Sequence, residues 1–203
     1  MSKGILTING LGNFKLRDII SSLQEVESAY NHIITFERVV DQLKVQLAIE
    51  HPRPFEQPQF FRKPYKPMRI RIPSSKTISN FVLPDEQLVL IRVQISSPGF
   101  WEFLGKLNPL EVIRQWMCDA HERRKDREYR EVAEQEHLTL ENQLLQNRVI
   151  HERIQILREL GATDADIAPL LNQLIYEPFR RTEAHQDKGI FFNAGIKRFP
   201  ENE

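Results

Sequence analysis

Residues 88–95 read Leu-Val-Leu-Ile-Arg-Val-Gln-Ile, and this stretch predicts a β-strand. β-Branched side chains recur there at every second position, which is the period of a strand. One face then carries Val89, Ile91, Val93 and Ile95, and the other carries Leu88, Leu90, Arg92 and Gln94.

The first fifty residues predict a short strand followed by helix. Ile5–Ile8 is β-prone and ends in a glycine-containing loop at residues 9–13, after which no Gly or Pro occurs before Pro52. In that interval apolar residues recur at spacings of three and four, which favours a helix. Asn31-His32 can divide this helix in two. Because Ile33–Phe36 is rich in β-prone residues, a strand at that position is the alternative.

Residues 51–67 contain five prolines and therefore predict an extended arm. Met68–Ile72 alternates apolar and basic residues, as expected of a strand with one solvent-exposed face. Together with the strands at 5–8 and 88–95, this indicates an α+β head over residues 1–100, with at least three short strands covered by helix.

Toward the C-terminus the sequence predicts helices. Ser97-Pro98 suggests a short helix through Phe100–Leu104 that ends at Gly105. Asn108 is a candidate N-cap, followed by an unbroken helix over 109–160 with a charged middle and Gly161 as its stop. At 1.5 Å per residue that helix would be about 78 Å long.

A second helix is expected to begin at Thr163, because Thr163–Asp166 resembles a capping box. It runs to Ile175, folds back on the long helix and gives a helical hairpin end. The predicted organisation is thus an α+β head (1–100), an aromatic junction (101–108), the two helices (109–176) and a tail of mixed polarity (177–203). Ile190–Phe192 is the one anchor or short strand expected in the tail.

The composition narrows the classes of protein to consider. The chain has 203 residues with 28 basic and 28 acidic side chains, so the formal net charge is zero. This balance excludes a globally basic nucleic-acid coat and a strongly acidic tail protein. The single cysteine, Cys118, and the absence of a secretory or membrane-spanning segment favour a cytoplasmic protein with no membrane association.

Motifs for catalysis or cofactor binding are weak. Gly10-Leu11-Gly12 lacks the remaining residues of a dinucleotide fingerprint or a P-loop, so a plain turn is favoured. Cys118 and His121 lie three residues apart on a predicted charged helix, but no orienting third group accompanies them. We therefore expect no catalytic residue, metal site or cofactor, and hence no enzyme.

The predicted long helix suggests a role in protein binding. Its ends carry apolar stripes that would be buried best against a second copy or another helical protein, although the heptad repeat is too broken for a strict coiled coil. The sequence therefore predicts a non-enzymatic oligomerising, adaptor or scaffold protein. The expected interface residues are Leu138, Leu145, Val149, Ile156 and Leu160.

The alternative function is binding of single-stranded nucleic acid. Residues 51–76 hold seven Lys or Arg and one acid, a local formal charge of +6, with four aromatic residues between them. Such a segment can contact phosphates and stack on bases. The candidate residues are Arg62, Lys63, Tyr65, Lys66, Arg69 and Arg71. Two other interpretations stay open: the arm packs on its own domain, or it binds an acidic protein surface.

Overall fold

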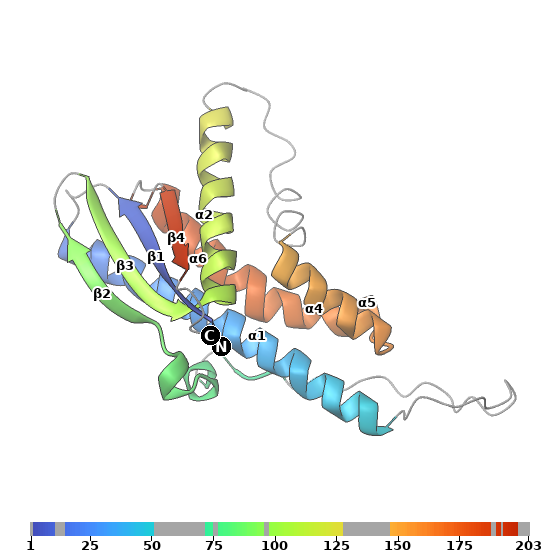
Figure 1. Ribbon diagram of the computed structural model, residues 1–203. Helices are drawn as coiled ribbons and strands as arrows, with labels where there is room; N and C mark the ends of the chain where they lie inside the picture. The colour runs from blue at the N-terminus through green and yellow to red at the C-terminus, as the bar shows by residue number, and fades with distance from the viewer. Residues whose placement is uncertain are drawn as a thin grey trace, which may run out of the picture.

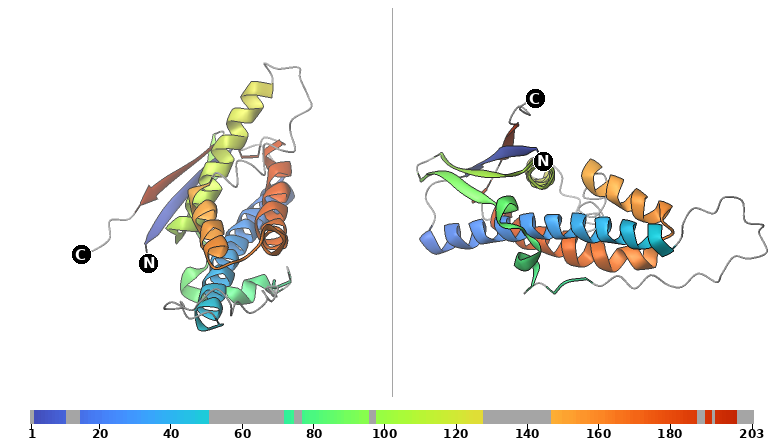
Figure 2. Two further views of the ribbon diagram at one scale, coloured as in Figure 1. Left: turned by 90° about the vertical axis from the view of Figure 1, so that its right-hand side faces the viewer. Right: turned by 60° about the horizontal axis from the view of Figure 1, so that its bottom comes forward.

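A computed structural model of the chain describes residues 2–10, 15–50, 72–74, 77–95, 98–127, 147–187, 190–191 and 193–198. It confirms the expected α+β class, because a four-stranded sheet lies against helices gathered on one of its faces (Figures 1 and 2). No helix within the described ranges is long and apolar enough to cross a membrane.

The sheet has the order β2-β3-β1-β4, and its three neighbouring pairs are antiparallel. β1 (Lys3–Gly10) and β3 (Gly99–Lys106) form the centre, while β2 (Val89–Gln94) and β4 (Asn193–Arg198) lie at the edges. The strands expected at 5–8 and 88–95 are confirmed. Because β1 pairs with β4, Gly4 near the start of the chain lies beside Arg198 near its end (Figure 1).

The expected helix at Phe100–Leu104 is wrong, because these residues belong to β3. Buried and half-buried side chains alternate along β3, and Trp101 and Phe103 point into the core. β3 pairs with β1 on one side and β2 on the other, so long-range pairing overrides the local helix signals at Pro98 and Gly105. The predicted aromatic junction is thus a central strand.

The first helix is α1 (Leu16–Glu50), which runs without a break for 35 residues. Helix is therefore the correct interpretation of this region; the strand considered for Ile33–Phe36 and the break at Asn31-His32 are wrong. Ile33, Ile34 and Phe36 are buried in the core. Of the strand predicted at Met68–Ile72, residues 68–71 lie outside the described residues, and Ile72 has no regular structure there.

The helix predicted to run unbroken over 109–160 does not pass through Asn147. α2 (Leu107–Arg127) and α4 (Arg148–Glu159) are described, and Asn147 is the N-cap of α4, with a non-helical ψ of 122°. The Asn147 side chain accepts a hydrogen bond from the Val149 N–H at 3.1 Å and donates one to Gln115 at 2.9 Å. Asn108 is not a cap, since α2 begins at Leu107.

The helical turn after α4 agrees with the sequence. α4 ends at Glu159 with Leu160 as its C-cap, and Gly161 directly after it adopts a φ of 94°, a conformation suited to glycine. Thr163 caps α5 (Asp164–Leu171), and the Asp166 carboxylate accepts from the Thr163 N–H at 2.9 Å, which completes the predicted capping box. Pro169 lies inside α5, and a π-helical segment, η4 (Asn172–Tyr176), follows.

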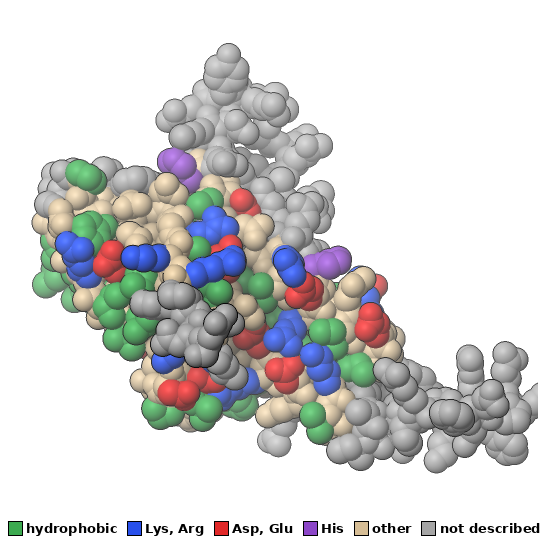
Figure 3. Space-filling view, in the orientation of Figure 1, with side chains coloured by type: hydrophobic (Ala, Val, Ile, Leu, Met, Phe, Trp, Pro, Cys, Tyr) green, Lys and Arg blue, Asp and Glu red, His purple; other side chains and the backbone are tan. Residues whose placement is uncertain are grey.

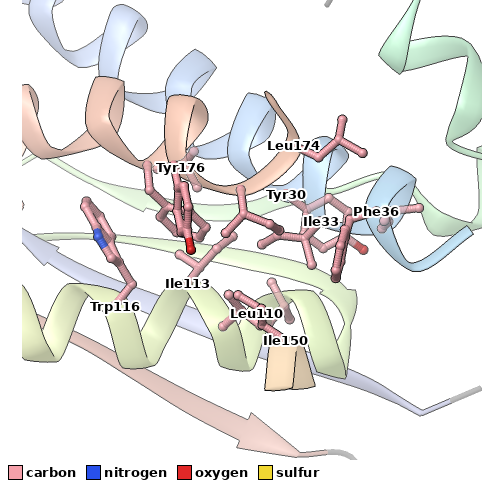
Figure 4. Packing of buried hydrophobic residues seen from close by; sticks show 14 of the residues in the cluster. Tyr30, Ile33, Phe36, Leu110, Ile113, Trp116, Ile150, Leu174 and Tyr176 are labelled. Carbon is pink, nitrogen blue, oxygen red and sulfur yellow. The ribbon is translucent and has the colours of Figure 1, made fainter. Parts of the chain in front are cut away.

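The predicted tail contains two elements, α6 (Glu177–Asp187) and β4. α6 packs along α1, and Phe179 contacts Trp116 of α2 with ring centroids 5.1 Å apart. Phe191, just before β4, packs edge-on against Trp101 at 5.6 Å. Figure 4 shows how side chains from α1, α2, α4 and the C-terminal helices meet in one core.

Candidate protein-interaction surface

Large hydrophobic side chains are exposed mainly along one edge of the molecule. Among the described residues, nine such side chains are exposed, and seven of them lie on or next to β2 and at the start of α1. We call these seven the β2 surface: Leu16, Ile20, Val89, Leu90, Ile91, Val93 and Ile95. Their exposed fractions range from 43% at Leu90 and Val93 to 67% at Leu16. Figure 3 shows hydrophobic side chains gathered over β2 and β3.

β2 is exposed along its whole length because it is an edge strand. Within the described ranges it pairs with β3 alone. Edge strands of natural proteins usually carry charges or prolines that discourage further pairing. β2 instead has one charged residue, Arg92, and no acid. An apolar strand in this position is typical of a surface that contacts another molecule.

A β-bulge decides which β2 side chains lie together. The register with β3 shifts between Leu90 and Arg92, so Ile91 is the extra residue. Leu90 pairs with Phe103 and Val93 with Trp101, which places both on the helix-facing side of the sheet. The simple alternation expected from the sequence, with Val93 opposite to Leu90, is therefore wrong beyond Ile91.

The start of α1 adds a second apolar layer at the same edge. Leu16, Ile20 and Leu23 follow a helical spacing of four and three, so they form one stripe along α1. A groove of about 260 Å³ separates this stripe from the sheet. Its lining residues are Ile20, Leu23, Gln24, Glu27, Leu88, Leu90 and Phe103. The β2 surface therefore combines a strand, a groove and a helix.

Arg92 is engaged within its own sheet. Its guanidinium lies 5.0 Å from the ring centroid of Phe100, a cation–π arrangement, and Arg92 is opposite Glu102 of β3. The positive charge of β2 is thus balanced locally. What the surface offers a partner is chiefly apolar side chains.

A second candidate site is a polar pocket of about 370 Å³ between α1, the end of β3 and the start of α2. The buried Glu86 carboxylate pairs there with Arg38, with Lys106 at 2.5 Å, and with the Leu83 N–H at 3.2 Å. Burial alone raises the pKa of Glu86. The hydrogen bonds from Lys106 and Leu83 and the charges of Lys106 and Arg38 outweigh that effect, so the pKa is lowered.

Tyr30 joins the backbone on both sides of this pocket. Its hydroxyl donates to the Glu86 carbonyl and accepts from the Lys106 N–H, both at 2.8 Å. Burial, first among the causes, raises the pKa of Tyr30 to about 12. A Cβ at Gly105 would lie 2.8 Å from the Tyr30 hydroxyl, so glycine is needed for this close approach.

Glu37 is the other carboxylate of the polar pocket. Burial raises its pKa, although Arg153 at 3.8 Å and a hydrogen bond from Asn108 at 3.5 Å oppose the rise. Arg153 also pairs with Asp41 at 2.8 Å. Since both Glu37 and Glu86 have cationic partners from other elements, the pocket serves to join α4 and the segment around Glu86 to α1.

Cys118 and Gly10, which the sequence offered for catalysis or phosphate binding, each lie close to a neighbouring element. The Cys118 thiol lies 3.4 Å from the carbonyl oxygen of Ala194 and so connects α2 to β4. Gly10 ends β1, where a Cβ would lie 2.1 Å from the Ile190 carbonyl oxygen. No group of three or more potential metal ligands occurs among the described residues.

The predicted helical interface is only partly described. Val149 and Ile156 are half-buried and pack against the protein's own core, and Leu160 is half-buried at the end of α4. Leu138 and Leu145 lie outside the described residues, as do Arg62, Lys63, Tyr65, Lys66, Arg69 and Arg71 of the basic arm. The nucleic-acid alternative therefore stays a prediction.

Sequence reasoning did not identify the β2 surface, although one signal was present. A strand with one solvent-exposed face should show polar residues on that face, yet residues 88–91 are apolar without interruption.

Comparison with models of known protein families, with curated protein sequences and with solved structures gave no match.

Proposed function

We propose that this protein is a non-enzymatic oligomerising or adaptor protein and that it binds a protein partner through the β2 surface. The observation that supports this is the concentration of exposed aliphatic side chains at one edge, on both a strand and a helix. Scattered exposed hydrophobic residues need no explanation, but a contiguous apolar patch is typical of an interaction site.

The energetics favour a covered state for this surface. Complete burial of a Val, Leu or Ile side chain is worth roughly 1.5 to 3 kcal/mol. Covering side chains that are about half exposed therefore gains roughly half of that at each position. The structure also favours this surface over Val149 and Ile156, because those two side chains already pack against the core.

Affinity capture with the full-length protein as bait tests the proposal. We expect Val93→Lys and Ile20→Lys to lose proteins that the unchanged bait retains from an extract of the source cells. Val45→Lys is the matched control, because Val45 is 61% exposed and lies on α1 outside the β2 surface. A bound set that is the same for Val93→Lys and the unchanged bait would contradict the proposal.

A further inference from the structure

The β2 surface is apolar in two layers at once, and this restricts what can cover it. A single added strand would pair with β2 but leave Leu16 and Ile20 of α1 exposed. A single helix in the groove would cover Ile20 and Leu90 but leave the free edge of β2 unpaired. A partner that covers both layers must itself present a strand edge beside a helix.

Figure 2 shows that the two layers end at the same place. The start of α1 lies below the hairpin end of β2 and β3, near the segment Val93–Ile95. A strand added to β2 at this end brings its own helical layer against Leu16 and Ile20. The edge of this same chain has the required form, because it presents β2 and the start of α1 together.

The charges of β2 permit two copies to meet. β2 contains no acid, and its one cation lies over Phe100 of its own chain. The bulge at Ile91 limits regular pairing to the part of β2 beyond it. In an antiparallel pair with a two-fold axis at Val93, Val93 faces the second copy's Val93. Arg92 then faces the second copy's Gln94, so no like charges are opposed.

We propose that a second copy of this chain covers the β2 surface. The two copies pair antiparallel through Arg92–Gln94 with Val93 at the two-fold axis, and Leu16 and Ile20 of the two α1 helices pack against each other below the joined sheets. An isologous contact of this kind closes the dimer, because each copy uses the same part of its β2 edge, beyond Ile91. This inference rests on the proposed function and names the partner.

Sedimentation velocity of the full-length chain across micromolar concentrations tests the dimer. We expect the unchanged chain and Val45→Lys to sediment as dimers. Val93→Lys and Val93→Glu should each weaken the dimer by about a hundredfold, since like charges would meet at the axis. Ile20→Lys should also weaken it, because the helical layer is part of the contact. Circular dichroism checks that each variant is folded.

A charge-pairing experiment tests the register. An equimolar mixture of Val93→Lys and Val93→Glu should recover a dimer, because opposite charges then face each other at the axis. A mixture that stays monomeric would overturn pairing at Val93. A dimer that persists in Ile20→Lys would overturn the two-layer contact.

The oligomeric state of the unchanged chain distinguishes failure of this inference from failure of the proposed function. If it is monomeric at all concentrations, the second copy is excluded as the partner. The proposed function then still holds if the capture experiment shows binding that depends on Val93, and fails with the inference if it does not.

Discussion

Glu86 and Glu37 are buried carboxylates whose pKa values move in opposite directions within one pocket. Glu86 has the Arg38 and Lys106 cations and the Leu83 N–H as close partners, so its charged form is favoured. Glu37 is held less closely, with Arg153 at 3.8 Å and Asn108 at 3.5 Å, so burial dominates. The balance between burial and these close partners therefore decides which carboxylate stabilises the fold at neutral pH.

Glu86→Gln should lower the free energy of unfolding by about 2 kcal/mol at pH 7, because hydrogen bonds to a buried charge are lost. Glu86 has a lowered pKa in the folded protein, so its contribution is complete above the ordinary value of 4.5 and is lost as the pH falls through the folded value. Urea denaturation measures both effects. Asp41→Asn, at an exposed ion pair, is the control and should cost less than about 1 kcal/mol.

Glu37→Gln should have the opposite effect and raise the free energy of unfolding by up to about 1 kcal/mol at pH 7. The raised pKa means that ionised Glu37 opposes folding. This penalty is absent below the ordinary value of 4.5 and grows as the pH rises through the folded value. The difference between variant and unchanged protein should therefore vanish in acid; a difference that instead grows in acid would contradict the assignment.

At the scale of elements, β3 and Tyr30 are held together by a close approach at Gly105. Gly105→Ala should cost about 1 to 3 kcal/mol, because a Cβ would displace the Tyr30 hydroxyl from its two hydrogen bonds. Gly195→Ala on β4 is the matched control, since nothing lies within 4 Å of its added Cβ. It should be neutral or slightly stabilising. Thermal unfolding of both variants checks the difference.

The Asn147 side chain stabilises the start of α4. Asn147→Ala should cost about 2 kcal/mol, because it removes both the N-cap and the hydrogen bond to Gln115. Asn147→Ser keeps a capping oxygen and should recover about half of the loss. Chemical denaturation of the two variants measures this; equal losses would show that the cap contributes nothing.

These elements also show how far sequence can predict this fold. Helix α1, the Thr163 cap and the Gly161 stop depend on residues close in sequence, and all three were predicted correctly. β3, the bulge at Ile91 and the pairing of β4 with β1 depend on neighbours far away in the chain. Local propensity carries no information on such pairing, so the edge position of β2 and the exposure that follows from it were missed.

At the scale of the whole molecule, the sheet has two different edges. Residues near the C-terminus form the β4 edge, where Lys197 and Arg198 are exposed, whereas the β2 edge is apolar. Charged side chains discourage edge-to-edge pairing and aliphatic ones permit it. In the proposed dimer this asymmetry directs association to β2, so one closed contact and no extended fibre is expected.

Amide hydrogen exchange of the full-length chain at low and high protein concentration tests the central claim most directly. We predict that amides of Arg92–Ile95, together with those near Ile20, exchange more slowly at high concentration, whereas those near Val45 do not change. Exchange rates in β2 that stay independent of concentration, or protection that appears only at another surface, would contradict it.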